Sequence, residues 1–183
     1  PLFNQLLNFT TTGVIYMFQM FENSEYNQSL NHWDFSNVNN VNSMFMSSAY
    51  NQPIDWNTER LVSATGMFKG SLFNSELRLD TSKLSSMQEM FLQHSHGSPR
   101  TVAWNRHLDL DVASDTNTDL LFHGAPFETA TDSVTVCNRV ATYSTFSHVT
   151  EFVNDYSSWG TEVCYNPPSA PPPLPPINPP PPS

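Results

Sequence analysis

Basic residues are scarce in this chain. Its 183 residues contain 7 Lys and Arg against 17 Asp and Glu, which gives a formal net charge of −10. Proteins bind nucleic acids and anionic membrane surfaces mainly through Lys and Arg. The charge balance therefore argues against both classes of partner, and no basic stretch offsets it.

Long hydrophobic runs and glycine-rich segments are also lacking. No run of 18 or more apolar residues occurs, so we predict no membrane insertion within this sequence. The 6 glycines are scattered, which leaves no glycine-rich phosphate loop, and no Gly-x-Ser-x-Gly nucleophile motif occurs. These absences predict a protein that is not an enzyme and uses no cofactor.

Cysteine occurs only twice, at Cys137 and Cys164. A disulfide between them would close a loop of about 27 residues and stabilise the fold by roughly 3 kcal/mol. Two free buried thiols are the alternative. We predict the disulfide, and with it an oxidising compartment outside the cell or at the cell surface.

One phrase, Met-Phe-x-x-Ser/Ala-x-Tyr/Phe-Asn, recurs along the chain. It begins at Met20, Met44 and Met67, which lie 24 and 23 residues apart. Met90-Phe91 follows after another 23, and Leu121-Phe122 follows after 31, which is the period plus an insertion of eight. A fixed period of this length indicates a solenoid, in which each coil buries its apolar face against its neighbours.

A column of asparagines keeps the same period. At a turn inside a stacked coil, an Asn carboxamide can bond backbone groups that would otherwise be buried without partners. We therefore interpret the column as a structural ladder rather than a binding site. The sequon at Asn27 falls in this buried ladder, whereas Asn8 is free to carry a glycan. The members of the column are Asn4, Asn27, Asn51, Asn74 and Asn105.

Each coil has two apolar segments of different spacing. In the first, apolar residues lie three apart, as in Val38, Val41 and Met44, which predicts a short helical or 3₁₀ turn. In the second they alternate, as in Ile54-x-Trp56, which predicts a short half-buried strand. The methionines of the first segment are predicted to fill the core. In three coils, a residue suited to cap a helix N-terminus stands two positions before the first apolar residue of this segment. These residues are Thr12, Ser36 and Ser82.

These patterns predict an α/β repeat fold. Residues 1–128 are predicted to form a leucine-rich-repeat-like solenoid of about five 23–24-residue coils, each with a short parallel strand and a short helix. We interpret residues 129–165 as a C-terminal cap, with a strand at 134–137 and helical spacing from Phe146 to Tyr156. Residues 166–183 are rich in proline and predict a disordered polyproline-II linker or tail, with a docking site for a proline-binding domain as the alternative.

The repeat resembles that of a known family. Trp33-Asp34-x-Ser36-x-Val38-x-x-Val41-x-x-Met44-Phe45 is similar to the Trp-Asp-x-Ser-x-Val-x-x-Met-x-x-Met-Phe repeat of BspA-like leucine-rich-repeat surface proteins. The resemblance covers about residues 1–128 and weakens where Leu79 and Leu110 replace Trp. It implies an extracellular or surface-exposed solenoid, often attributed to adhesion, without catalytic residues.

If the protein binds a partner, we predict that the exposed sheet face binds it. Side chains between the buried strand positions point outward together and form a surface of mixed charge. His94-x-His96 could hold a metal ion, but no further His or Cys lies at ligand spacing, so we interpret the two as exposed loop histidines and predict no metal site. His107-x-Asp109-x-Asp111 alternates along a predicted strand, which leaves a weak divalent-ion site there as an alternative. The predicted binding residues are Asn31, His32, Asp55, Glu76, Arg78, His107 and Asp109.

We predict a non-catalytic interaction or adhesion module, secreted or on a cell surface. Its partner would be a protein or glycan on a host, matrix or neighbouring cell surface. The alternatives are a carbohydrate-binding module tethered by the Pro-rich linker and a purely structural spacer. Exposed aromatic residues would favour carbohydrate binding, but Phe9, Trp33 and Trp56 are predicted to be buried. Because the sequence opens partway through a repeat, we expect it to be a piece of a longer protein.

Overall fold

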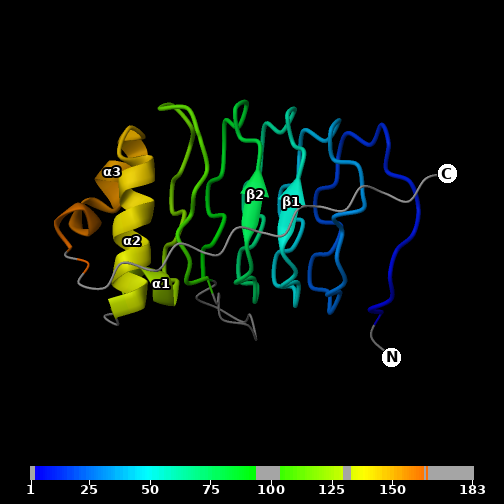
Figure 1. The fold of residues 1–183 in the computed structure, drawn as a ribbon, viewed down its shortest axis with the longest axis horizontal. Coiled ribbons are helices and arrows are strands. Elements are labelled where there is room, and N and C mark those ends of the chain that lie inside the picture. Colours follow the sequence, from blue (N-terminus) through cyan, green and yellow to red (C-terminus); the bar gives the residue numbers. More distant parts are fainter. Residues whose placement is uncertain (1–2, 94–103, 130–132, 163, 165–183) are drawn as a thin grey trace.

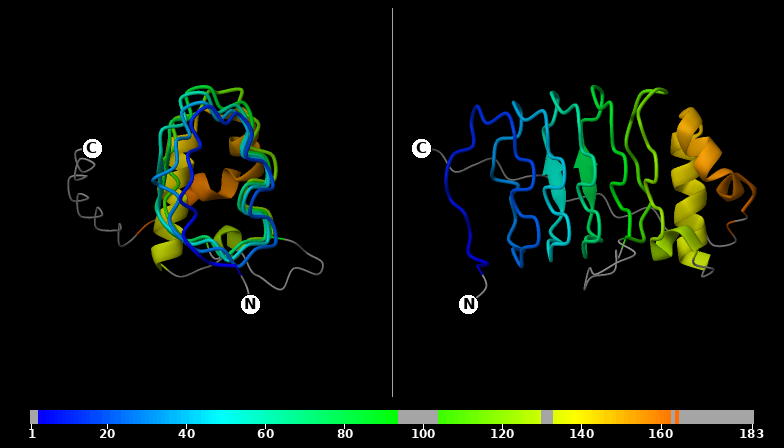
Figure 2. Two further views of the ribbon diagram at one scale, coloured as in Figure 1. Left: turned by 90° about the vertical axis from the view of Figure 1, so that its right-hand side faces the viewer. Right: turned by 180° about the vertical axis from the view of Figure 1, so that it is seen from behind.

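The fold is a row of chain coils closed at one end by helices (Figure 1). This computed structural model describes residues 3–93, 104–129, 133–162 and 164. Seen along the row, successive coils nearly eclipse one another, with the helices behind them (Figure 2). The elements are β1 (Ile54–Trp56), β2 (Leu77–Leu79), α1 (Pro126–Thr129), α2 (Ser133–Phe146), α3 (Thr150–Asp155) and the 3₁₀ helix η1 (Ser157–Thr161).

Neighbouring coils pair through parallel backbone bridges. β1 and β2 form a two-stranded parallel sheet in which Asp55 lies opposite Arg78. Elsewhere the bridges are isolated, and β1 and β2 are the only strands in the part of the chain that the structure describes. The solenoid class and the three domain boundaries therefore stay predictions. One series of bridges follows the sequence period through Tyr16, Asn40, Ser63, Ser86 and Asn117.

The segments predicted to be short helices are runs of tight turns. Between residues 3 and 125 the described chain contains no helix. One residue with positive φ, such as Ser43 at 53° or Gly66 at 60°, stands directly before each Met-Phe or Leu-Phe pair. An α-helix needs negative φ at every position, so these residues prevent it from forming. The other members of this set are Gln19, Glu89 and Leu120, at 54–56°.

The tight turns direct backbone N–H groups toward the next coil. We call these runs the turn segments; they comprise residues 17–23, 41–47, 64–70, 87–93 and 118–124. In the second, alternate N–H groups from Val41 to Ser47 donate to carbonyl oxygens from Ser63 to Lys69, at 2.8–3.0 Å. The same four bonds recur at each of the other three junctions between turn segments. Hydrogen bonds between coils therefore replace those that a helix would make within itself.

The core between the coils is a column of stacked rings. Neighbouring rings lie 5.3–5.7 Å apart, with planes within 13° of parallel. Such offset stacking adds to the free energy of burial. Met44, Met67 and Met90 are fully buried beside the column, whereas Met20 in the first coil is 44% exposed. The column consists of Phe21, Phe45, Phe68, Phe91 and Phe122.

The Trp-Asp-x-Ser phrase folds into a local turn in which Asp is the acceptor. Both the N–H and the hydroxyl of Ser36 donate to Asp34 Oδ1, at 2.9 and 2.6 Å. Asp80 and Ser82 repeat this arrangement at 3.0 and 2.7 Å. In the first coil, the Thr12 N–H donates to Thr10 Oγ1 at 3.4 Å. The prediction that Thr12, Ser36 and Ser82 cap helices is therefore wrong, because no helix follows them.

The strand predicted at residues 134–137 is wrong, since this segment lies in α2. Its β-branched residues favour a strand locally. The buried stripe of α2, however, consists mostly of polar side chains at helical spacing, which apolar periodicity does not detect: Thr135, Asn138, Arg139, Thr142 and Phe146. Within the described residues, no helix is long and apolar enough to cross a bilayer.

Candidate interaction surface

The asparagine column bonds the coils to one another. Asn74 Oδ1 accepts the Asn105 N–H at 2.9 Å, and the same bond recurs from Asn4 to Asn74 at 2.7–2.8 Å. Asn138 of α2 extends the column by donating to the Asn105 carbonyl at 2.9 Å. The column is not buried, contrary to the prediction: Asn4 and Asn51 are exposed, and Asn27, Asn74 and Asn105 are half-buried. Because the turns that carry the column lie at the surface, the carboxamides accept hydrogen bonds from backbone N–H groups that are partly open to solvent.

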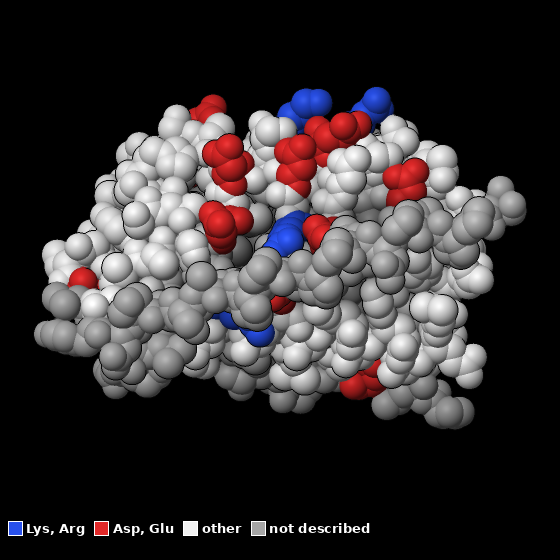
Figure 3. Space-filling model, viewed as in Figure 1, with Lys and Arg blue, Asp and Glu red and all other residues white. Residues whose placement is uncertain are grey.

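The predicted sheet face is centred on Asp55 and Arg78, at the middle of β1 and β2. Both side chains are exposed, and their Cα atoms are register partners. Neither side chain bonds to another of the described residues, so both charges are open to solvent. Acidic side chains gather over the face that carries β1 and β2, with fewer basic ones among them (Figure 3).

Asn31 and His32 lie one coil before Asp55 and are both exposed. The Asn31 carboxamide is tied to the next coil: Nδ2 donates to the Pro53 carbonyl at 3.1 Å, and Oδ1 accepts the Asp55 N–H at 3.3 Å. His32 Nε2 lies 2.8 Å from the Leu7 carbonyl. These two side chains therefore serve the scaffold as well as the surface.

The last predicted residues lie on either side of β2 in the chain. Glu76 is half-buried, and Asp109 and His107 are exposed. His107 packs toward α2, with Nε2 2.9 Å from Thr145 Oγ1. This partial loss of solvent lowers the pKa of His107, although the nearby Asp109 opposes the shift. Among the described residues, no three His, Cys, Asp or Glu side chains lie where one metal ion could join them. His94 and His96 lie outside the described residues.

Exposed aromatic residues in the first coil are the feature that the sequence prediction missed. Phe9 was expected to be buried but is 49% exposed, and it packs on Trp33 with ring centroids 4.9 Å apart. Tyr16 and Phe18 are 61% and 57% exposed. Aligning the coils carries a signal for these two, because polar residues fill their places in every later coil.

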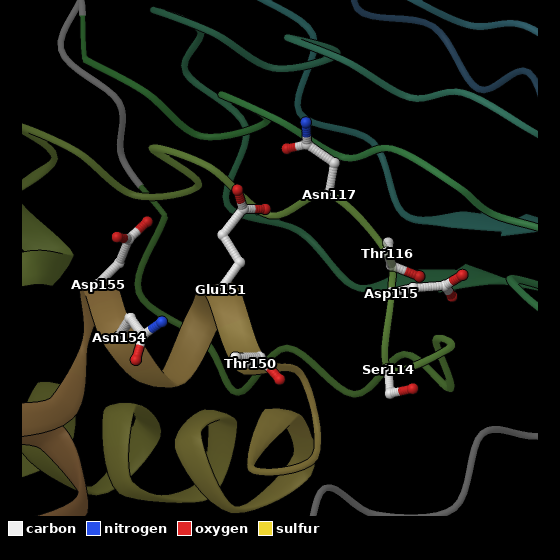
Figure 4. Close-up of a pocket in the computed structure, with 8 residues that line it drawn as sticks. All are labelled: Ser114, Asp115, Thr116, Asn117, Thr150, Glu151, Asn154 and Asp155. Carbon is white, nitrogen blue, oxygen red and sulfur yellow. The ribbon is translucent and has the colours of Figure 1, made fainter.

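A cleft of about 580 Å³ separates the last coil from α3 (Figure 4). Two of its carboxylates accept hydrogen bonds from the backbone of the last coil. Glu151 accepts the Thr118 N–H at 2.7 Å, and Asp155 accepts the Leu120 N–H. Burial raises the pKa of Asp155, and the neighbouring Asp119 and Glu151 raise it further. Glu151 and Asp155 therefore serve the fold, whereas Asp115, which also lines the cleft, is exposed.

The same row of donors continues beyond the cleft. Tyr156 Oη accepts the Phe122 N–H at 2.7 Å, and Glu128 accepts the Gly124 N–H at 2.8 Å. Residues 118, 120, 122 and 124 are the N–H donors that would meet a further coil. Four side-chain oxygens of the helical end thus replace the four carbonyls that a next coil supplies elsewhere.

Two further links hold the helical end together. Cys137 of α2 is bonded to Cys164 in a disulfide. Arg139, 3% exposed, donates to both carboxylate oxygens of Glu162 at 3.0 and 2.7 Å and to the Phe127 carbonyl at 2.9 Å. A buried guanidinium needs such paired partners.

A family model matches residues 1–78 and, in a second copy, residues 55–167. The two matches together extend over all the coils and the helical end. Comparison with curated proteins and with solved structures gives no match. The chain belongs to the family described as Mycoplasma protein of unknown function, DUF285.

Proposed function

We propose that the protein is a non-catalytic interaction module, secreted or displayed on a cell surface, that binds a protein partner through its sheet face. The observation that carries this proposal is the pair Asp55 and Arg78. Both are exposed at the centre of the two-stranded sheet, yet neither side chain bonds to another of the described residues. Charged side chains held on a rigid surface and left without internal partners are suited to a complementary surface.

The fold and location proposed here are those of a BspA-like surface repeat. In this proposal the coils are leucine-rich-repeat-like units. The asparagine column and the turn segments bond one coil to the next, and the residues between them can vary without loss of the fold. The disulfide supports an oxidising compartment, because such bonds are rare in reducing cytosol. Asn8 is exposed, as a glycan-bearing residue must be, whereas Asn27 Oδ1 already accepts two hydrogen bonds.

The test compares binding of the wild-type chain and of an Asp55→Lys/Arg78→Glu variant to a panel of purified extracellular-matrix proteins by surface plasmon resonance. Reversal of both charges preserves net charge and is expected to weaken binding at least about tenfold, since opposed charges at an interface are costly. Glu59→Lys/Lys83→Glu, also exposed, is the matched control and should bind as the wild type does. Equal binding by all three proteins contradicts the proposal, and no binding to any protein favours a spacer.

A further inference from the structure

The outer side of the turn segments changes character in the first coil. The bridge position holds Asn40, Ser63, Ser86 and Asn117 in the later coils, but Tyr16 in the first. Two residues further on, the later coils hold Asn42, Thr65, Gln88 and Asp119, but the first holds Phe18. An outward-facing surface that is polar in four coils is therefore aromatic in one.

The position of the first coil at the end of the row does not explain these aromatic residues. Its core positions are filled by Met17 and Phe21, which are 3% and 6% exposed. Tyr16 and Phe18 alternate with them in the chain and point the other way. Asn40, at the equivalent position of the next coil, is still half-exposed although coils flank it on both sides. Tyr16 and Phe18 are thus surface residues of their coil.

A hollow lies on the first three coils, and neutral polar groups stand beside the two rings. The hollow measures about 390 Å³ and is lined by residues of three coils, among them Ile15, Asn39 and Arg60. Beside Tyr16 and Phe18, the oxygens of Asn40 and Asn42 accept backbone or hydroxyl hydrogens. No hydrogen bond within the described residues engages the NH₂ groups of Asn39, Asn40 or Asn42. Of the described residues that line the hollow, Arg60 is the one with a charged side chain.

We propose that a neutral oligosaccharide binds on the outer side of the first two coils, at residues 16–18 and 39–42. Sugar rings would stack their C–H faces on Tyr16 and Phe18, and their hydroxyl groups would accept hydrogen bonds from the carboxamides of Asn39 and Asn40. Ligand sites combine apolar or aromatic walls with a few polar groups that fix orientation. Asn39, Asn40 and Asn42 carry no charge, which suits the hydroxyl groups of an uncharged sugar, and Arg60 lies on the third coil. This surface is separate from the sheet face and does not depend on its function.

The experiment uses isothermal titration calorimetry with cellohexaose, chitohexaose, laminarihexaose and mannohexaose as neutral probes. The variants are Tyr16→Asn and Phe18→Asn, which introduce the residues of the next coil and are expected to leave the fold intact; circular dichroism is the check on folding. We expect at least one probe to bind, and each variant to weaken it about tenfold or more. Leu72→Asn removes a different exposed apolar side chain and should bind as the wild type does.

Three results would overturn the inference: no binding by any of the four probes, undiminished binding by the Tyr16→Asn/Phe18→Asn double variant, or loss of binding only in Asp55→Lys/Arg78→Glu. If instead the double variant loses only a matrix-protein partner in the resonance assay, the aromatic residues serve a protein interface, and the carbohydrate inference is wrong. If Asp55→Lys/Arg78→Glu does not affect protein binding, the proposed function is wrong, but the oligosaccharide titrations still test the carbohydrate inference. The two proposals are therefore judged separately.

Discussion

At the scale of single residues, each turn segment depends on one residue with a left-handed backbone, and the residue types at these positions do not predict that conformation. Only Gly66 is a glycine among the five residues that stand before the Met-Phe or Leu-Phe pairs. A side chain in this conformation costs about 1–2 kcal/mol per residue. Four coils therefore carry this cost, which the hydrogen bonds between coils and the buried Phe column must outweigh.

Gly66→Ala should lower the free energy of unfolding by roughly 0.5–1 kcal/mol, because the left-handed cost of about 1–2 kcal/mol in the third coil exceeds the roughly 0.5–1 kcal/mol of chain entropy that Ala recovers. The new Cβ would meet its nearest atom, Ser43 Oγ, at 3.5 Å, an ordinary contact, so the loss reports backbone strain alone. Ser43→Gly is the reverse change and should raise the free energy of unfolding by roughly 0.5–1 kcal/mol, since relief of the left-handed strain exceeds the entropy cost of glycine. Urea unfolding measures both; equal losses in the two variants would refute the explanation.

Two aspartates should respond to pH in opposite directions. The hydroxyl and N–H of Ser36 lower the pKa of Asp34, so its stabilising contribution is present above its unfolded pKa and is lost as pH falls through the lower folded value. Burial raises the pKa of Asp155, so its contribution is largest at low pH and is lost as pH rises through the raised folded value.

Unfolding free energies between about pH 2 and pH 7 check this pair, with each variant compared to the wild type. The wild type should gain stability relative to Asp34→Asn as pH rises. It should lose stability relative to Asp155→Asn as pH rises through the raised pKa of Asp155. Asn keeps an oxygen that can accept the Leu120 N–H, so Asp155→Asn isolates the charge. Slopes of the same sign for both aspartates would show that one assignment is wrong.

At the scale of elements, α3 and its neighbours act as a substitute for a coil. Phe122 at the end of the ring column packs on Trp159 of η1, with centroids 5.6 Å apart, and its N–H bonds to Tyr156. Both contacts repeat those between neighbouring coils, in which aromatic rings stack on one another and backbone N–H groups donate to oxygens. The helices therefore end the row without leaving its apolar surface or its N–H groups open.

Tyr156→Phe should cost about 1–3 kcal/mol of stability, because it leaves the buried Phe122 N–H without an acceptor while preserving the ring. Tyr143→Phe is the control: the Tyr143 hydroxyl makes no hydrogen bond with any described residue, so its removal should change stability by less than about 0.5 kcal/mol. Thermal unfolding followed by circular dichroism measures both variants. Equal stability of Tyr156→Phe and the wild type would mean that water already serves the Phe122 N–H.

Sequence periodicity predicts the positions that every coil repeats. The asparagine column is readable because each member bonds the next at a fixed interval, and Asn4 to Asn105 are joined in that order. Features that occur once are not readable in this way. The helix at residues 133–146 escapes because its buried stripe is polar, and the turn segments escape because Gln19, Glu89 and Leu120 are ordinary helix formers by propensity. Phe9 was predicted to be buried by analogy with Trp33, which has a coil on each side.

At the scale of the whole molecule, the two ends of the row differ. The C-terminal end is closed by helices that a disulfide and a buried ion pair hold together. The first coil exposes Ile15, Tyr16, Phe18 and Met20. In solenoids a closed end blocks further stacking and protects the core from water. Most of the large apolar side chains that are exposed among the described residues therefore lie in the first coil, and the others are Val62 and Leu72.

Removal of the disulfide should loosen the closed end. We expect Cys137→Ala/Cys164→Ala to lower the free energy of unfolding by about 2–4 kcal/mol, since the unfolded chain regains the freedom of a 27-residue loop. Hydrogen exchange should show that the backbone amides of α2 and η1 exchange faster in the variant than in the wild type, whereas those in the turn segments of the first three coils change little. A variant as stable as the wild type would show that the Arg139 and Glu162 contacts suffice.

The uniform direction of the turn-segment bonds has an electrical consequence. Each bonding N–H points toward the C-terminal coil and each accepting C=O toward the N-terminal one, at every junction. In ordinary sheets neighbouring peptide dipoles largely cancel, but here they add along the row as they do in an α-helix. The last coil therefore presents partial positive charge, which explains why Glu128, Glu151 and Asp155 are its neighbours. The first coil presents partial negative charge, so a Lys at its rim would be stabilised and an Asp there would be repelled.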